Sequence, residues 1–470
     1  MNSPTAANEA PHWLRGAFGR GVLWLVFLAP LFFLSYGHAN QHAADIDADT
    51  GVTSFYFAWE HAIPLWPWTI IPYWSIDLLY GFAFLCCRDR MATNRLGMRL
   101  LSVQLICITC FFLWPLRFAF VRPPLDGLSG TLFDALTSFD LPYNQAPSLH
   151  IALLVIVWRQ FVGILPAPPR KEAGEASALA PRAVRILIHA WAILIGVSVL
   201  TTWQHHFIDI PTGLPVGLFC LWLWPETGSS PLHRAAARRP ALALRYFAGA
   251  LLALAAALAL GGIWLILCWL ALALALVAFN YAWAGAAGFQ KHGGRQSFAA
   301  YWLFAPYTLG AWINARLWTW RRRDPAPVAD GVWLGPLPTA REFAAWGARH
   351  GGEAALFDLT AELPAPRLPA RTAYDGVPCL DLVPVRGGDL AEAVRRLTLL
   401  HDGKREVWVA CALGYSRSAS VVAAWLCAAT GKTASIQEAV ARLRQTRPQI
   451  VLGADSLACL EAFRAGLSRQ

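Results

Sequence analysis

A cysteine and an arginine that could act together on a phosphate group lie near the end of the chain, in residues 411–418 (CALGYSRS). Residues 406–410 predict a buried strand before them, and residues 418–429 predict a helix after them. A loop between a strand and a helix N-terminus binds anions, because unpaired N–H groups and the positive end of the helix dipole point at it. That field lowers the pKa of Cys411, and the planar guanidinium of Arg417 can hold two phosphoryl oxygens. The spacing therefore predicts thiolate attack on phosphorus.

The residues between the cysteine and the arginine complete the predicted phosphate-binding loop. Gly414 allows the backbone to curl inward, so that several N–H groups can face one phosphate. The predicted phosphate-binding residues of this loop are Ala412, Leu413, Gly414, Tyr415 and Ser416. The alternative interpretation is a buried cysteine that precedes an ordinary helix.

A second group of residues with phosphate chemistry lies in the apolar part of the chain. Two histidines, His150 and His205, can act as a nucleophile and as an acid for the leaving group. His205 and Asp209 stand four residues apart, one helical turn, so the carboxylate can orient the imidazole ring. The adjacent His206 points about 100° away on a helix and is the weaker candidate. The guanidinium groups of Arg117 and Arg122 can bind phosphate oxygens, and Ser148 is expected on the same membrane face.

The composition places these residues in a membrane protein. The chain has 470 residues, 56% of them hydrophobic, with 23 tryptophans, and its mean hydropathy is +0.42. These values are typical of polytopic membrane proteins and not of fully soluble ones. Apolar runs of spanning length predict about eight transmembrane helices. They lie at residues 21–36, 66–87, 98–117, 148–166, 184–203, 209–225, 246–261 and 263–284.

The charges of the loops predict the orientation of these helices. Cytoplasmic loops are rich in Lys and Arg, and the basic stretches at 88–95, 169–185 and 233–245 all fall on the side of the N-terminus. The intervening loops are acidic, as at 45–49, or very short. Both termini are therefore expected in the cytoplasm, and the histidine group on the opposite face of the membrane. The net charge of +10 follows from these loops and does not indicate a nucleic-acid partner.

The chain divides into three predicted parts. Residues 1–228 form a polytopic α-helical membrane domain, residues 229–323 add two further spans and a basic segment, and residues 324–470 form a soluble α/β domain. Within the middle part, residues 297–320 are apolar but have basic residues at both ends. This pattern favours a helix that lies in the membrane interface over a ninth span.

Two charged residues inside the predicted spans suggest a buried ion pair. Asp77 and Arg159 each lie about ten residues from the outer end of antiparallel spans, and at about 1.5 Å per residue they share one depth. Because isolated charges inside a membrane are unfavourable, we expect them to pair. The alternative is that Arg159 extends to the interface and that Asp77 binds water.

The sequence around Cys411 resembles a known family. CALGYSRSA resembles the cysteine, five residues, arginine signature of the dual-specificity subgroup of the protein tyrosine phosphatases, and GVWLGPLP, LFDLTAE and RLRQTRPQI extend the likeness across the tail. The resemblance implies that Asp381 protonates the leaving oxygen and that Ser418 helps to release the cysteine. Asp389 is the competing acid, but it directly precedes a predicted helix and can act as its cap. The family usually has histidine where this chain has Ala410, which predicts slower catalysis.

The membrane half resembles a second family. RFAFVRP, PSLH and HHFID resemble the three motifs of the type 2 phosphatidic acid phosphatase superfamily, in particular its branch related to inositol phosphorylceramide and sphingomyelin synthases, over residues 60–228. The resemblance implies that His205 attacks phosphorus, that Asp209 supports it, and that His150 protonates the leaving alcohol. It assigns phosphate binding to Arg117, Arg122 and Ser148.

The expected function is that of a bifunctional membrane phosphatase that requires no metal or organic cofactor. Its histidine site would hydrolyse a phospholipid or polyprenyl phosphate on the outer face, and its cysteine site would act in the cytoplasm on a phosphoprotein or a lipid headgroup phosphate. The alternative is a membrane-anchored cysteine phosphatase whose membrane half transfers a lipid headgroup or is an inactive lipid-binding anchor. Leu149 and Val199, which stand where the second family has glycine and arginine, keep this alternative open. The Ala- and Arg-rich composition is typical of a bacterial inner-membrane protein.

Overall fold

The computed structural model describes residues 16–165, 175–329, 331–350, 353–370, 372–401, 403, 405–428 and 435–467. The chain divides into two compact units, Met1–Glu226 and Thr227–Gln470. The segments predicted as separate parts at 229–323 and 324–470 fall together in the second unit. Residues 169–174 of the predicted basic loop lie outside the described residues.

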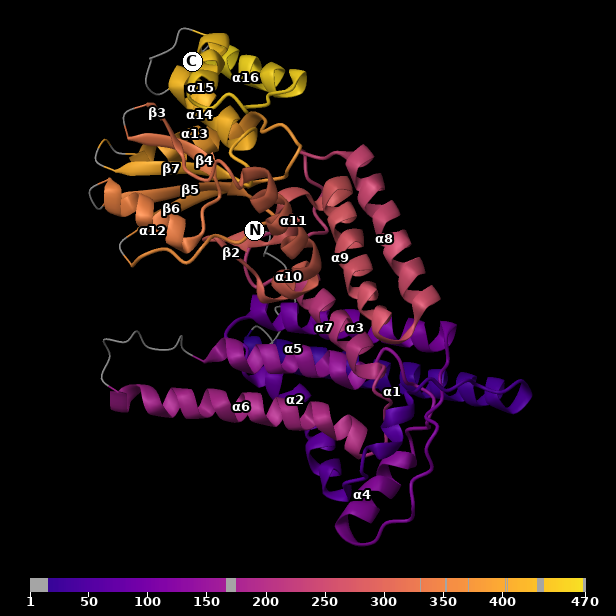
Figure 1. The fold of residues 1–470 in the computed structure, drawn as a ribbon. Coiled ribbons are helices and arrows are strands. Elements are labelled where there is room, and N and C mark those ends of the chain that lie inside the picture. Colours follow the sequence, from indigo (N-terminus) through magenta and orange to yellow (C-terminus); the bar gives the residue numbers. More distant parts are fainter. Residues whose placement is uncertain are drawn as a thin grey trace, which may run out of the picture. The chain divides into compact units, whose positions relative to one another are not determined.

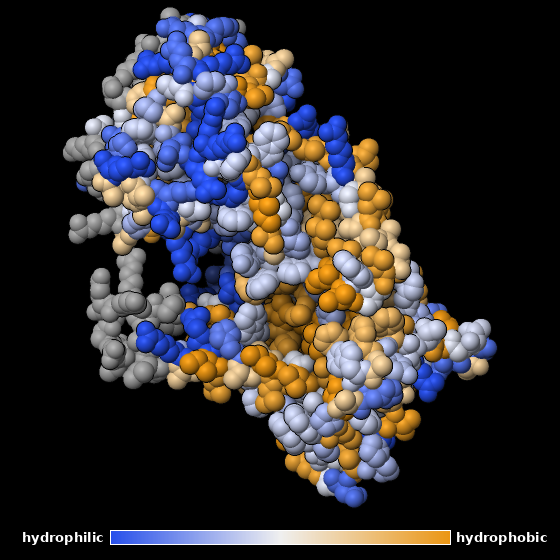
Figure 2. All heavy atoms as spheres, viewed as in Figure 1, coloured by the Kyte–Doolittle hydropathy of each residue, from blue (hydrophilic) through white to orange (hydrophobic). Residues whose placement is uncertain are grey.

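The first unit is a set of apolar helices (Figure 1). Large apolar side chains such as Leu34, Leu78 and Ile186 are exposed on them, and Figure 2 shows apolar surface over this part of the chain. Exposed apolar surface on this scale is typical of helices that contact lipid. The elements are α1 (Ala17–Asp49), η2 (Ala58–Ala62), η3 (Pro67–Thr69), α2 (Ile70–Leu85), α3 (Arg90–Leu113), α4 (Gly127–Thr137), α5 (Leu149–Ile164), α6 (Glu175–Thr201) and α7 (Asp209–Leu223).

Five helices of the described chain are long and apolar enough to cross a membrane. The predicted runs at 66–87, 148–166 and 209–225 form the shorter helices α2, α5 and α7, which have 16, 16 and 15 residues. A perpendicular span needs about 20 residues, so the count of about eight spans stays a prediction. The five candidate spans are Ala17–Asp49, Arg90–Leu113, Pro181–Thr201, Pro240–Leu260 and Gly262–Phe289.

The ion pair predicted between Asp77 and Arg159 is wrong. Arg159 binds Glu226 instead, with its Nη2 2.9 Å from the carboxylate Oε2. Because α5 has only 16 residues, Arg159 lies in its second half, close to the end of the bundle where the chain leaves α7. A carboxylate just outside the helices is therefore its partner, and not one within α2.

The second unit begins with a hairpin of two apolar helices, α8 (Pro240–Leu260) and α9 (Leu267–Phe279) (Figure 1). Gly261 and Gly262 both have positive φ and make the reversal between them, which an L-residue with a side chain would adopt only with strain. The elements that follow are η4 (Gly262–Ile266), the π-turn η5 (Asn280–Ala284), η6 (Gly285–Phe289), β1 (Lys291–His292) and β2 (Arg295–Gln296).

The apolar segment predicted as one helix at 297–320 forms two, α10 (Phe298–Leu303) and α11 (Ala305–Thr319). The break falls at Phe304, and Pro306 stands in the first turn of α11, where its missing N–H is tolerated. Neither helix is among the candidate spans. The location of this segment in the membrane interface remains a prediction.

The rest of the second unit is a five-stranded sheet with helices on both faces (Figure 1). The strand order is β3-β4-β7-β5-β6, with β3 antiparallel to β4 and the other pairs parallel. The central strand and the helix after it confirm the elements predicted at 406–410 and 418–429, the last residue of which is not described. The elements are β3 (Ala326–Ala329), β4 (Val332–Pro336), α12 (Ala340–Arg349), β5 (Ala354–Thr360), β6 (Ala373–Cys379), α13 (Gly387–His401), β7 (Glu406–Cys411), α14 (Arg417–Ala428), α15 (Ile436–Thr446) and α16 (Ala454–Leu467).

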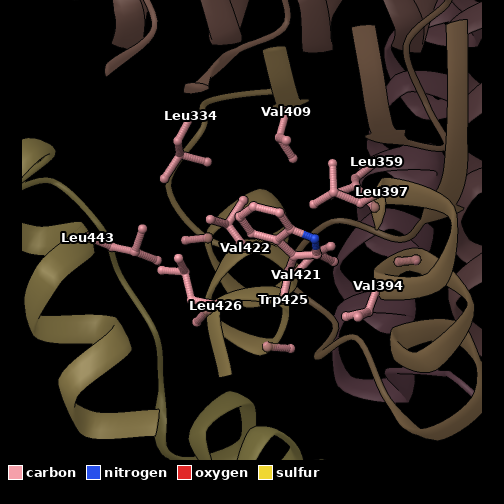
Figure 3. Close-up of a cluster of buried hydrophobic side chains, with 14 of the residues drawn as sticks. Leu334, Leu359, Val394, Leu397, Val409, Val421, Val422, Trp425, Leu426 and Leu443 are labelled. Carbon is pink, nitrogen blue, oxygen red and sulfur yellow. The ribbon is translucent and has the colours of Figure 1, made fainter. Parts of the chain in front are cut away.

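Side chains of the central strand β7 alternate between the two faces of the sheet. Val409 and Cys411 join the cluster that helices α13 to α16 cover, whereas Trp408 and Ala410 join the cluster that includes α12. Figure 3 shows part of the first cluster, in which Trp425 of α14 lies among aliphatic side chains. Packing on both faces holds the carboxyl end of β7, and with it Cys411, in a fixed position.

Candidate functional site

Cys411 and Arg417 occupy the two ends of a tight loop between strand β7 and helix α14. Cys411 is the last residue of the strand and Arg417 the first of the helix. Gly414, in the middle, has φ of +72°, and a Cβ atom there would lie 2.4 Å from the carbonyl carbon of Gly335. Only glycine fits this position, because both the backbone conformation and the space exclude a side chain.

The thiol of Cys411 is buried and has a hydroxyl partner. It is 3% exposed, and Ser418 Oγ donates to its Sγ across 3.2 Å. Burial raises the pKa of Cys411, but the positive charge of Arg417 and the hydrogen bonds from Ser418 lower it more, so the net pKa is below its ordinary value. The prediction of a depressed cysteine pKa therefore agrees with the local electrostatics.

Arg417 is buried and is held by two carboxylates. Its Nη1 and Nη2 donate to Glu362 across 2.8 and 2.7 Å, and Nη2 lies 3.0 Å from Oδ1 of Asp381. Nη1 also donates to the carbonyl of Cys379 across 2.9 Å. Its Nε, in contrast, has no hydrogen-bond partner in the part of the chain that the structure describes. The protein thus fixes the orientation of the guanidinium and leaves one buried N–H, that of Nε, without a protein acceptor among the described residues.

Asp381, the predicted acid, lies beside the loop, and its side chain is 44% exposed at the edge of the site. Its competitor Asp389 does not precede a helix as expected, because α13 begins two residues earlier, at Gly387. Asp389 therefore lies inside the first turn, where a negative charge stabilises the helix dipole. No hydrogen bond or ion pair joins it to Cys411 or Arg417 in the described ranges.

Sequence reasoning missed two residues that position this loop. Glu362, the bidentate partner of Arg417, ends the LFDLTAE segment that carried part of the resemblance, and its acidic type after a buried strand was the available signal. Arg447 donates to the carbonyl of Leu413 across 3.3 Å and lies over the ring of Tyr415, 5.3 Å from its centroid. These contacts constrain the loop although Ala410 replaces the usual histidine.

The segment that carries Asp381 is bound to the helical hairpin of the same unit. The hydroxyl of Tyr281 in η5 donates to the backbone carbonyl of Asp381 across 3.1 Å. The guanidinium of Arg239, at the start of α8, donates to the carbonyl of the next residue, Leu382. Leu382 has φ of +56°, which is strained for a leucine. Arg239 and Tyr281 thus hold the turn that carries Asp381, which we call the acid-bearing turn, in a strained backbone conformation.

In the first unit the two catalytic candidates His205 and His150 lie together. His205 Nδ1 is 2.9 Å from Oδ2 of Asp209, and both residues are buried. The rings of His205 and His150 are 6.5 Å apart between centroids, and Tyr73 stacks on His150 at 4.2 Å. The expected helix through 205–209 is wrong, since α7 begins only at Asp209. The pair forms across a turn instead.

Of the predicted phosphate-binding residues here, Arg122 lies near His205, but Arg117 pairs elsewhere. Arg122 donates to the carbonyls of Thr202 and Trp203, each across 3.2 Å. Arg117 forms an ion pair of 3.1 Å with Asp47, and its side chain is 50% exposed.

The remaining residues of this group have structural partners. The hydroxyl of Ser148 accepts from the N–H of Ile151 and caps α5, and its own N–H donates to the carbonyl of Asp209 across 3.4 Å. His206, the weaker candidate, has a different partner, since its Nδ1 lies 3.0 Å from Oε2 of Glu60. Ser148 is therefore adjacent to the histidine pair, and His206 is not part of it.

No protein-family model and no curated protein matches the chain. Among solved structures, the chain is similar to human DUSP28, with 23% identity and a TM-score of 0.27, over 31% of this chain and 99% of that one. It is also similar to a mouse putative dual specificity phosphatase complexed with zinc tungstate, with 24% identity and a TM-score of 0.28, over 32% and 91%. For PTPMT1 in complex with PI(5)P the identity is 18% and the TM-score 0.27, over 31% and 97%. The similarity to the dual-specificity phosphatase fold concerns only part of the chain.

Proposed function

We propose that the chain is a membrane phosphatase with two sites, a cysteine site in the α/β domain and a histidine site in the first unit. The observation that carries the proposal is the geometry of Cys411, whose thiol ends the central strand, accepts from Ser418 and lies within the charge of Arg417. A buried thiolate beside a guanidinium and a helix N-terminus suits attack on a bound phosphate.

In the first step, the Sγ of Cys411 attacks phosphorus and the bond to the ester oxygen breaks. Asp381 gives its proton to that oxygen, so that an alcohol or phenol leaves rather than its anion. The N–H groups of Ala412, Leu413, Gly414, Tyr415 and Ser416 hold the equatorial oxygens together with Arg417. The product is a cysteinyl phosphate.

In the second step, water attacks the phosphorus of the cysteinyl phosphate. Asp381, now ionised, accepts a proton from that water, and the bond between phosphorus and sulfur breaks. Ser418, whose hydroxyl already donates to the sulfur across 3.2 Å, stabilises the departing thiolate. Inorganic phosphate leaves, and the thiolate and the protonated acid are restored.

The contact between Asp381 and Arg417 gives the acid a second role. The carboxylate lies 3.0 Å from Arg417 Nη2, where it occupies part of the guanidinium that a phosphate would use. Protonation of Asp381, which the first step requires, removes the charge that holds it there. The acid form of Asp381 therefore opens Arg417 to the phosphate, while Glu362 keeps the guanidinium in place.

The proposed histidine site hydrolyses lipid phosphate esters. His205 attacks phosphorus, Asp209 holds its ring and stabilises its positive charge, and His150 protonates the leaving alcohol. The contact of 2.9 Å between His205 and Asp209 supports this assignment. Arg122 and Ser148 are assigned to the phosphate, while Arg117, paired with Asp47, contributes less. A phospholipid or polyprenyl phosphate is the substrate class, at the outer face of a bacterial inner membrane, with both termini in the cytoplasm.

A second candidate function is a cysteine phosphatase whose membrane half transfers a headgroup or only binds lipid. The buried Leu149 and Val199, at positions where the related family has glycine and arginine, favour it. An alcohol acceptor that increases turnover at His205 would identify the transferase, and lipid binding without turnover would identify the anchor.

The proposal is tested by phosphate release from p-nitrophenyl phosphate, a phosphotyrosine peptide and a panel of lipid phosphates. The full chain is compared with Cys411→Ser and His205→Ala, and with Cys459→Ser, a partly exposed cysteine outside the site, as the matched control. Loss of a different activity in each of the first two variants supports two sites. If Cys411→Ser and Cys459→Ser behave alike, the cysteine chemistry is refuted.

The arginine assignment has its own test. Arg122→Ala should lower lipid phosphate hydrolysis by about 100-fold or more, since a charge-assisted contact to the transition state is lost. Arg117→Ala should lower it much less. Equal losses of lipid phosphate hydrolysis in the two variants would show that Arg117 binds the phosphate as well as Arg122 does.

A further inference from the structure

The cysteine site is joined to the helical hairpin by more than the acid-bearing turn. Lys291, in the short hairpin after η6, is buried, and its Nζ donates to Asp358 across 2.6 Å and to the carbonyl of Thr360 across 2.8 Å. Both acceptors lie at the carboxyl end of β5, directly before Glu362. The carboxyl end of β5, which leads to Glu362, is therefore also bound to the chain that continues from α9.

Helix α11 adds a further set of bonds to the same domain. Arg316 donates to Glu342 of α12 across 3.0 Å and to the carbonyl of Leu337 across 3.0 Å. Thr308 donates to the carbonyl of Glu362 across 3.4 Å. The α/β domain is thus not tethered by a linker alone, because polar contacts join its catalytic edge to the residue before α8, to η5, to β1 and to α11.

Three tyrosines of these helices line this edge. Tyr246 of α8 stacks on Tyr281 at 5.4 Å between centroids and meets Tyr307 of α11 edge to face at 5.7 Å. The hydroxyl of Tyr281 donates to the backbone carbonyl of Asp381 across 3.1 Å. The acid-bearing turn therefore packs against an aromatic cluster that belongs to the helices and not to the α/β domain.

Helix α8, which carries Tyr246, has the length and the exposed apolar side chains of a membrane-spanning helix. α8 has 21 residues, about 31 Å at 1.5 Å per residue, which matches the hydrocarbon core of a bilayer. Its outer side chains Leu244 and Leu252 are 68% and 72% exposed, as are large apolar residues of α11 such as Leu317 and Trp318, at 67% and 68%. Arg239, which holds the acid-bearing turn, stands one residue before α8, at the level of the headgroups.

Exposed basic residues lie near the start of α8 and directly after α11. Arg234 and Arg245 flank the start of α8, and the run 321–323 follows α11, all of them exposed. Such groups attract anionic lipids to a membrane surface. Together with the polar contacts above, they bring the catalytic edge to the headgroup region of the leaflet that faces the α/β domain.

We propose that the substrate of the cysteine site is a phosphate monoester on the headgroup of a lipid in that leaflet, and this inference rests on the proposed function of the site. The lipid stays in the bilayer while its phosphate enters the loop at the edge where the acid-bearing turn meets the helices. A lipid held in the same membrane as the enzyme has a high effective concentration at the site, which a soluble phosphopeptide lacks.

The test compares substrates that differ only in their acyl chains. The full chain with His205→Ala, which removes the other proposed site, is placed in nanodiscs that contain dioleoyl phosphatidylinositol 4-phosphate or dioleoyl phosphatidic acid. The soluble counterparts are glycerophosphoinositol 4-phosphate and glycerol 3-phosphate, and a phosphotyrosine peptide represents protein substrates. We expect kcat/KM for at least one lipid to exceed those of its soluble counterpart and of the peptide by about 100-fold, and to be lost in Cys411→Ser.

The opposite results overturn the inference. It fails if neither lipid is cleaved faster than its soluble counterpart, or if the peptide is the better substrate. Hydrolysis of p-nitrophenyl phosphate by the same preparations separates this failure from failure of the proposed function. Where that hydrolysis depends on Cys411, only the substrate class is wrong; where it does not, the cysteine chemistry itself is refuted.

Discussion

Removal of one hydroxyl group, in Tyr281→Phe, isolates the effect of the helical hairpin on the acid. The hydroxyl donates to the backbone carbonyl of Asp381 across 3.1 Å and belongs to a side chain that is 1% exposed. Phenylalanine keeps the ring and its stacking on Tyr246, so the variant loses the hydrogen bond and little else. The carboxylate of Asp381, its neighbours and the loop around Cys411 are unchanged.

The size of the effect follows from the hydrogen bond. A net contribution of about 0.5–1.5 kcal/mol to the acid-competent position of the turn corresponds to a fall of about 2- to 12-fold in its population. The rate should fall by that factor only where the leaving oxygen needs a proton. Complete loss of the acid, as in Asp381→Asn, should remove about 10²- to 10⁴-fold.

The assay uses two leaving groups. Phenyl phosphate requires protonation of its ester oxygen, whereas p-nitrophenolate is stable enough to leave as the anion. Tyr281→Phe should therefore lower kcat for phenyl phosphate and leave kcat for p-nitrophenyl phosphate nearly unchanged. Tyr301→Phe, which removes a half-exposed hydroxyl from α10 of the same unit, is the matched control and should alter neither rate.

Two results would refute this reasoning. An equal fall for both substrates would show that the hydroxyl supports the fold or the loop and not the acid. No fall for either would show that the remaining contact, from Arg239 to the carbonyl of Leu382, holds the turn by itself. The pH profile gives an independent check, because loss of acid catalysis removes its descending limb for phenyl phosphate only.

The remaining predictions concern the loop and its supports. Burial raises the pKa of Cys411, but Arg417 and Ser418 bring it below the ordinary value of a thiol. The rate of alkylation by iodoacetamide should therefore reach half its maximum at a pH below that value. Ser418→Ala should move this midpoint to higher pH. Glu362→Gln removes the charge that compensates a buried guanidinium and should cost about 3 kcal/mol, read as a lower unfolding temperature. Gly414→Ala should abolish phosphatase activity, because the added Cβ would lie 2.4 Å from a backbone carbon.

The last two of these predictions have control variants in the same domain. Glu392→Gln breaks exposed ion pairs on α13 and should leave the unfolding temperature unchanged. Gly388→Ala, at a position with no atom within 4 Å of the added Cβ, should keep full activity. An alkylation midpoint in Ser418→Ala that equals that of the unmodified chain would show that the hydroxyl does not stabilise the thiolate.

Contacts between neighbours in the sequence could be predicted from the sequence. Cys411, Gly414 and Arg417 belong to one short loop, and its strand, its glycine and its helix follow from local patterns of apolar residues and from the demand for positive φ. The contact between His205 and Asp209 is also present as predicted. It forms across a turn and not within a helix, because a spacing of four residues brings two side chains together in both.

Partners that are distant in the sequence were decided only by the tertiary structure. Arg417 binds Glu362, 55 residues away, and the carbonyl of Asp381 accepts from Tyr281, 100 residues away. The predicted partner of Arg159 was Asp77, but its partner is Glu226. The apolar pattern gives the position of a residue along a predicted helix, but it does not give the residue at which that helix ends. A long charged side chain reaches several carboxylates of an unfolded chain equally, and the packing of the folded chain determines which of them lies within about 3 Å.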